Sequence, residues 1–172
     1  MGHRPFITPA GVVIVVLAIG FCIVAAVLGA KHRAKLLQKG SIIHREKGFW
    51  DYSETFTVKV VTLEAVYNRF QKVLPEKTGI VHELQPENNR IVFVFNGYDD
   101  SFKGTIKLVS SEDDVNTYRL LVNEYKTKGN SDPNETALNL LYTAVEKTFL
   151  GFDPNIKVKT EYVDRKTSRS FF

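Results

Sequence analysis

The longest hydrophobic stretch of the chain is residues 11–30, GVVIVVLAIGFCIVAAVLGA, which contains no charged residue. A helix rises about 1.5 Å per residue, so twenty residues span roughly 30 Å, the thickness of the hydrocarbon core of a bilayer. The domain that follows is too small to bury such a helix and also to fill its own core. The pattern therefore predicts one transmembrane helix.

A cleaved signal peptide is the alternative interpretation of this stretch. The apolar region of a signal peptide is about 7 to 15 residues long and is followed by a small-residue cleavage site. Here the apolar region is longer, and the best candidate site, residues 24–26, lies inside it. A retained anchor is therefore the favoured interpretation.

Basic residues are distributed unequally on the two sides of the span. Arg4 and the amino terminus precede it, whereas six basic residues follow it closely: Lys31, Arg33, Lys35, Lys39, Arg45 and Lys47. Lys and Arg next to a span tend to remain in the cytoplasm. The sequence predicts a single-pass protein with its N-terminus outside and its domain in the cytoplasm. The alternative is a domain on the extracytoplasmic side.

Four of these residues, Lys31, Arg33, Lys35 and Lys39, are candidate contacts for lipid headgroups. Three of them are spaced by four, so they share one helix face if the helix continues to a C-cap at Gly40. Basic residues in such a position attract anionic headgroups, by about 1 kcal/mol each. The simpler interpretation is that they only determine the topology.

A stripe of small residues within the span, Ala18, Cys22 and Ala26, is a candidate helix–helix contact face. Small residues repeated every four positions let two membrane helices approach closely. Small residues are also common in any span, so the stripe allows self-association without requiring it.

After the span, the hydrophobic period changes to that of a small α+β domain. Alternation over residues 55–61 predicts a strand, and helical spacing over residues 63–73 predicts a helix capped by Thr62 and stopped by Pro75. Four further strands are predicted at residues 79–85, 90–97, 102–110 and 116–125.

A second helix and a last strand complete the pattern. Asp132, Pro133 and Glu135 predict the N-terminus of the helix, with Asp132 as the cap. Its apolar face contains Ala137, Leu140, Leu141, Ala144, Val145 and Phe149, and Gly151 ends it. Alternation over residues 156–163 predicts the final strand, with Ile156, Val158 and Tyr162 on one face.

The predicted order is β-α-β-β-β-β-α-β, which is typical of an α+β domain. We expect an antiparallel sheet of about six strands covered on one face by two helices. An expanded ferredoxin-like layout and a helix-grip layout both fit this order. The predicted organisation is an N-terminal segment, a transmembrane helix, a basic juxtamembrane helix and linker, the domain, and a flexible tail, at residues 1–10, 11–30, 31–54, 55–164 and 165–172.

The charge of the chain is concentrated next to the span. The net charge is +4, but residues 1–50 contain seven Lys and Arg against one acid, whereas residues 51–172 contain sixteen against eighteen. A nucleic-acid footprint should lie on the domain itself, so we expect no nucleic-acid partner. The strand aromatics are then core residues rather than a stacking surface for bases: Phe93, Phe95, Phe102, Tyr118 and Tyr125.

The sequence offers little that identifies a reaction. Cys22 is the only cysteine, the four His residues are widely separated, and His82 alone lies within the domain. Residues 130–141 resemble a calcium loop but have Glu135 and Leu141 where Gly and Glu are needed. No nucleotide-binding or hydrolase motif occurs. We therefore assign no catalytic residue, cofactor or metal.

Three functions remain possible for a domain of this kind. The first is an interaction or regulatory module held near the bilayer, which binds a protein partner or a second copy of itself. The second is a small-ligand or lipid-binding domain with an apolar cavity between sheet and helices. The third, least favoured, is an enzyme that uses scattered carboxylates and His82.

Overall fold

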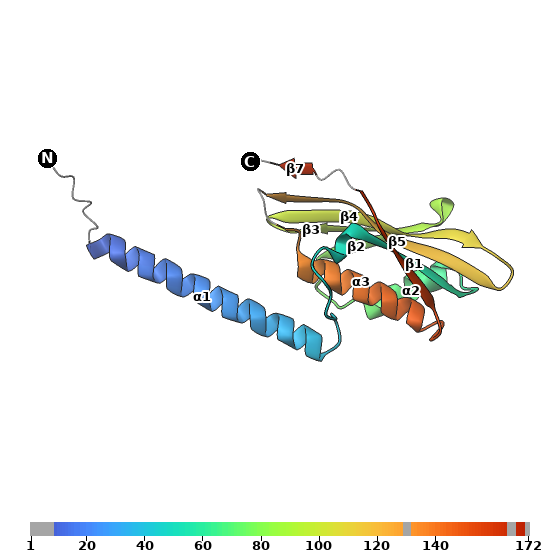
Figure 1. Cartoon of the computed structure of the whole chain (residues 1–172), viewed down its shortest axis with the longest axis horizontal. Coiled ribbons are helices and arrows are strands. Elements are labelled where there is room, and N and C mark those ends of the chain that lie inside the picture. The colour runs from blue at the N-terminus through green and yellow to red at the C-terminus, as the bar shows by residue number, and fades with distance from the viewer. Residues whose placement is uncertain (1–8, 129–131, 165–167, 171–172) are drawn as a thin grey trace. The chain divides into compact units, whose positions relative to one another are not determined.

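The computed structural model describes residues 9–128, 132–164 and 168–170, and it divides into two units between Gly40 and Ser41. The first unit contains helix α1 (Pro9–Gln38) (Figure 1). The most apolar window of 18 residues in this helix has a mean hydropathy of 3.0, and none of that window is buried in protein. In the described part of the chain, α1 is the one helix long and apolar enough to cross a membrane, as predicted. Gly40, with φ of +63°, follows its end.

The second unit, residues 41–172, is called the domain below. Its strands are β1 (Tyr52–Lys59), β2 (Ile80–Gln85), β3 (Arg90–Asn96), β4 (Asp100–Ser111), β5 (Val115–Lys128) and β6 (Lys157–Tyr162). Helix α2 (Leu63–Val73) lies between β1 and β2, and helix α3 (Glu135–Leu150) lies between β5 and β6. Short 3₁₀ turns, η1 (Phe49–Asp51) and η2 (Pro86–Asn88), precede β1 and β3. The predicted element order is confirmed.

A last short strand, β7 (Ser168–Ser170), lies in the segment that was predicted to be a flexible tail. It pairs in parallel with the end of β5. The rest of that tail and the first eight residues of the chain lie outside the described residues.

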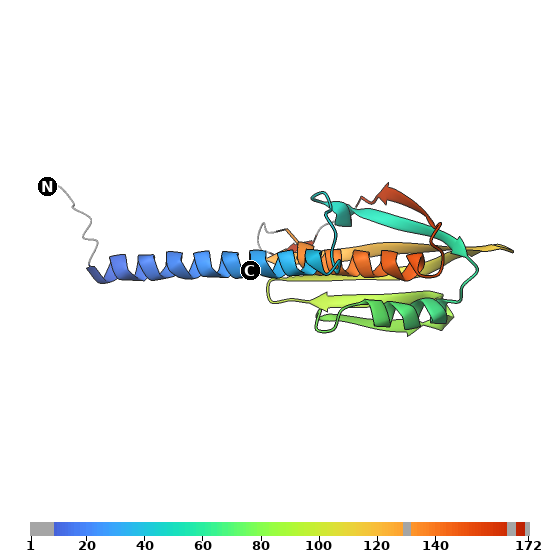
Figure 2. The same ribbon diagram turned by 90° about the horizontal axis from the view of Figure 1, so that it is seen from below.

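The strands form one sheet in the order β2-β3-β4-β5-β1-β6, with antiparallel neighbours throughout. Each helix therefore connects two strands that run in the same direction, with at least one antiparallel strand between them. These neighbour relations match the expanded ferredoxin-like layout. Both helices lie on one side of the sheet (Figure 1), and α2 and α3 pack side by side there (Figure 2).

The core lies between the sheet and the two helices. Alternate strand residues point toward the helices and are almost completely buried, among them Phe56, Ile91, Ile106, Tyr118 and Leu120. The helix residues Val66, Phe70, Leu141, Val145 and Phe149 fill the other side of the same core. The strand aromatics are therefore core residues, as expected, with Tyr125 partly buried at the margin.

The helix starts show one success and one error of the sequence analysis. The Thr62 hydroxyl accepts a hydrogen bond from the Ala65 amide at 3.2 Å, which confirms it as the cap of α2. The cap of α3 is not Asp132 but Asn134, whose side chain accepts from the Ala137 amide at 3.0 Å. Asp132 instead forms an ion pair with Lys47 at 2.6 Å.

The last strand is exposed, although Ile156, just before it, packs against the core. All six residues of β6 are exposed, including Val158 at 47% and Tyr162 at 67%. The strand is at the edge of the sheet and pairs only with β1 among the described strands. Alternation thus predicts the strand correctly, but it does not predict that both of its faces are exposed.

Helix α3 is buried on more than its sheet-facing side. Every residue from Ala137 to Val145 is buried, which an amphipathic surface helix would not be. Residues 41–51, predicted as part of a linker, pack on it and close its outer side: Ile42 is 1% exposed and Trp50 is 3% exposed. This segment therefore belongs to the packed part of the domain.

Two valines test the difference between the covered and uncovered strands. We expect Val58→Ala in β1 to lower the free energy of unfolding by about 2 kcal/mol, because two buried methyl groups are lost and a cavity forms. The matched change Val158→Ala in β6 should cost less than about 0.5 kcal/mol. Denaturant unfolding of the full chain in detergent, followed by the fluorescence of Trp50, measures both. Equal losses would contradict the exposed position of β6.

Candidate functional site

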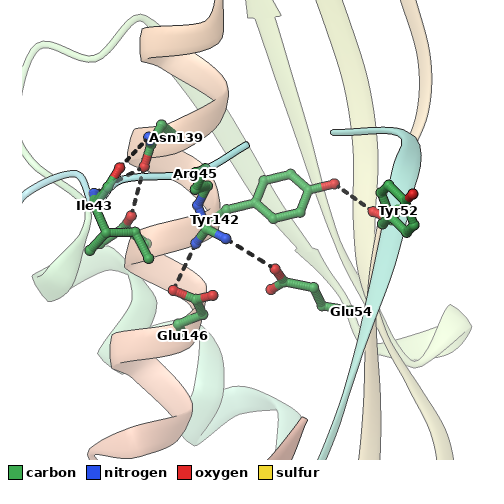
Figure 3. A network of polar contacts seen from close by, with 8 residues as sticks. Ile43, Arg45, Tyr52, Glu54, Asn139, Tyr142 and Glu146 are labelled. Carbon is green, nitrogen blue, oxygen red and sulfur yellow. Dashed lines mark hydrogen bonds and ion pairs between the residues drawn. The ribbon is translucent and has the colours of Figure 1, made fainter. Parts of the chain in front are cut away.

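Buried polar side chains, among them Glu54, Asn139 and Thr143, gather where residues 41–51 pack on α3 and the start of β1. Arg45 comes from this segment, Glu54 from β1 and Glu146 from α3. Figure 3 shows the Arg45 side chain between the two carboxylates. We call these three residues the Arg45 cluster.

The guanidinium of Arg45 is shared unequally by the two carboxylates. Its Nη1 lies 3.3 Å from Glu54 Oε1, and its Nη2 lies 2.7 Å from Glu146 Oε2. The side chains of Arg45 and Glu54 are only 10% and 6% exposed, whereas that of Glu146 is 23% exposed. The guanidinium also lies over the rings of Phe49 and Tyr142, 5.2 and 5.4 Å from their centroids, in cation–π geometry.

One cation cannot neutralise both carboxylates. Glu146 makes the shorter contact and is nearer to solvent, so it is the better partner for Arg45. Burial, and then the charge of Glu146, raise the pKa of Glu54 from its ordinary 4.5 to about 8, although Arg45 acts in the opposite direction. Its Oε2 is buried and has no hydrogen-bond partner among the described residues. Glu54 therefore holds a proton at neutral pH.

Hydrogen bonds from α3 side chains to the backbone of residues 41–51 hold this segment on the helix. The buried Asn139 side chain donates from Nδ2 to the Ile43 carbonyl at 2.8 Å and accepts from the Ile43 amide at 3.2 Å, as a neighbouring strand would. Thr143 donates to the same Asn139 oxygen at 3.0 Å. On the other side of the Arg45 cluster, the Tyr142 hydroxyl donates to the Tyr52 carbonyl at 2.9 Å (Figure 3).

A hollow of about 340 Å³ lies beside the Arg45 cluster, between residues 45–49 and the exposed strand β6. Its lining includes Arg45, Glu54, Phe49, Tyr52 and Thr160. This arrangement can hold and release one proton, and it can hold the segment that precedes β1. A nucleophile activated by a base is not found in it.

His82, the one histidine considered as a catalytic candidate, lies elsewhere. Its ring meets Tyr67 and Phe70 of α2 edge-on, at centroid distances of 5.6 and 5.4 Å. Burial lowers its pKa. The described residues contain no group of three or more His, Cys, Asp or Glu side chains that could hold a metal ion.

The residues predicted for lipid and helix contacts all lie in the first unit. Lys31, Arg33 and Lys35 are in the last two turns of α1, and Lys39 follows its end. Ala18, Cys22 and Ala26 lie in the middle of the same helix, and all three are exposed. Their contacts with lipid or with a second helix stay predictions. Arg45 and Lys47, counted with the basic residues after the span, form ion pairs within the domain instead.

Sequence reasoning missed the Arg45 cluster because its members are far apart in the chain and follow no motif. Glu54 was placed in the linker, before the predicted start of the first strand. One signal was present: Tyr142 and Asn139 extend α3 beyond a single apolar face, so something must cover its outer side.

Glu54→Gln tests the electrostatics of the Arg45 cluster. A carboxyl whose pKa is raised in the folded state contributes stability that is complete below pH 4.5 and is lost as the pH rises through about 8. The free energy of unfolding of the wild type should therefore fall relative to the variant by up to about 1.4 kcal/mol per pH unit in this range.

The matched control is Glu46→Gln, which makes the same substitution at an exposed residue of the same hollow. Its stability should follow the wild-type pH profile. Urea titrations of full-length proteins between pH 4.5 and 9 give the three profiles. Parallel profiles for wild type and Glu54→Gln would show that Glu54 does not hold the proton.

Comparison with known proteins gives no assignment of this site. No protein-family model matches the chain. No curated protein sequence matches it either.

Proposed function

We propose that the chain is a single-pass membrane protein whose α+β domain acts as an interaction and regulatory module next to the bilayer. The domain lies on the cytoplasmic side, and its partner is a protein or a second copy of the chain. The unequal distribution of basic residues around the span supports this orientation.

The shortness of the connection between anchor and domain carries the proposal. Helix α1 ends at Gln38, and Ile42 is already buried in the domain. The intervening residues, 39–41, can span at most about 15 Å, because consecutive Cα atoms are about 3.8 Å apart. The hydrogen bonds of Asn139 and the Arg45 cluster keep residues 42–51 from lengthening this connection. Such a domain works close to the end of its helix.

A ligand-binding domain with a cavity between sheet and helices is the second candidate. The space between them is occupied by large side chains, including Phe56, Phe93, Tyr118 and Phe149, all of which are completely buried. Phe56 and Phe149 stack at a centroid distance of 4.6 Å. This packing favours the interaction module over the ligand-binding domain.

Thiol labelling in intact cells tests the anchor and the side of the domain. Cys22→Ala removes the native thiol, and Asp113→Cys introduces one in the exposed turn between β4 and β5. We expect the protein to stay in the membrane fraction at alkaline pH. The new thiol should resist a membrane-impermeant maleimide until the cells are lysed.

The matched control places the thiol before the span, as Thr8→Cys in the same Cys22→Ala background. This thiol should react in intact cells. The reverse labelling of the two variants would place the domain outside, and release of the protein at alkaline pH would rule out the anchor.

A further inference from the structure

The face of the sheet opposite to α2 and α3 carries a row of cations. Register aligns Arg90 of β3 with Lys107 of β4, and Lys107 with Arg119 of β5. The same row continues through Thr55 of β1 to Lys159 of β6. Four cations thus lie on one line across five strands, and three of them are direct cross-strand neighbours. We call Arg90, Lys107, Arg119 and Lys159 the cationic row.

Folding alone does not favour this arrangement, because like charges directly opposite each other in a sheet are destabilising. One carboxylate forms ion pairs with the row: Glu161 lies 2.7 Å from the Lys159 ammonium and 3.7 Å from the Arg119 guanidinium. Among the described residues, neither Arg90 nor Lys107 forms an ion pair. Arg90 donates to the neutral Gln85 side chain at 2.9 Å. The row therefore retains a net positive charge.

Register places three acids on this face, Glu83, Glu124 and Glu161, which are fewer than its cations, and most other acids of the domain lie elsewhere. Residues 51–172 contain more acids than Lys and Arg, yet this face is cationic. Many of the acids are in turns at the ends of the strands, at residues 99–100 and 112–114. The domain is thus near neutral as a whole but has separated charges, with one positive surface.

The positive surface is shallow and contains aliphatic side chains but no stacking platform. A hollow of about 270 Å³ on it is lined by Thr105, Lys107, Val109, Arg119 and Leu121. The Phe and Tyr side chains of the described strands alternate with these residues and lie on the helix side. Single-stranded nucleic acids are usually bound by a cationic groove combined with aromatic side chains. A broad anionic surface fits this face better.

We propose that the cationic row binds the phosphate-bearing headgroups of anionic lipids in the bilayer that holds α1. This inference rests on the proposed function, because it needs the domain to be tethered to that bilayer. Adjacent strands are about 4.8 Å apart, so the row extends over roughly 19 Å and can meet several headgroups at once. The short connection keeps the local concentration of headgroups high, so weak contacts suffice.

Fluorescence quenching by headgroup-linked quenchers tests the proposal with the full chain in lipid vesicles. A fluorophore on Thr105→Cys, in the Cys22→Ala background, reports on the cationic face. The same fluorophore on Asn68→Cys reports on exposed α2, on the helix side. We expect stronger quenching at residue 105 in phosphatidylserine vesicles than in phosphatidylcholine vesicles. Residue 68 should show no such gain, and about 1 M salt should abolish the difference.

Charge reversal tests whether the cationic row causes the lipid-dependent quenching. The double change Arg90→Glu with Lys107→Glu should weaken the binding of this face to the bilayer. The ratio of bilayer-bound to unbound domain should fall by roughly fivefold or more for each cation lost. The matched control, Lys72→Glu with Lys77→Glu, makes the same change of net charge on exposed helix-side residues. In this control the fluorophore at residue 105 should be quenched as strongly as in the wild type. Unchanged Trp50 fluorescence shows that each variant is folded.

Each other outcome overturns the proposal in a recognisable way. Vesicle flotation reports the anchor separately, so a protein that floats without lipid-dependent quenching refutes the inference but not the proposed function. A protein that does not float refutes the proposed function. Loss of quenching in inorganic phosphate at constant ionic strength would assign the row to free phosphate. Row-dependent binding of an acidic peptide or an RNA on phosphatidylcholine vesicles would assign it to that partner.

Discussion

The burial of helix α3 is the constraint on which the rest of the domain depends. The helix is apolar or hydrogen-bonded on nearly every side, so the sheet alone cannot cover it. Its neighbour α2 covers one flank, and the segment before β1 covers another. Because that segment is also the connection to α1, the packing of the core and the tethering of the domain depend on the same residues.

The polar residues at this junction follow from the same burial. A chain crossing a buried helix must satisfy its own backbone groups, and the Asn139 amide does so for Ile43. The charge of Arg45 is acceptable there because aromatic rings and Glu146 surround it. Glu54 is the residue whose negative charge would have no cation to balance it. Its proton is the consequence of having one cation for two carboxylates.

The sequence predicted the elements well and their environments less well. Periodicity located both helices and the strands from β1 to β6, because side-chain alternation and helical spacing are local properties. It does not show what covers a face, so the exposure of Val158 was not predicted, and Ile42 and Trp50 were placed in a linker. The cationic row was also beyond reach, because only the register between strands brings Arg90, Lys107 and Arg119 into line.

The short connection between α1 and the domain also has a mechanical meaning. If α1 is the membrane anchor that we propose, a pull on it would reach Ile42 after three residues and then the contacts of Asn139 and Arg45. Those contacts cover α3, so such a pull would act on the cover of the core rather than on a loose tether. A rise in pH through about 8, which removes the proton of Glu54, would act on the same contacts.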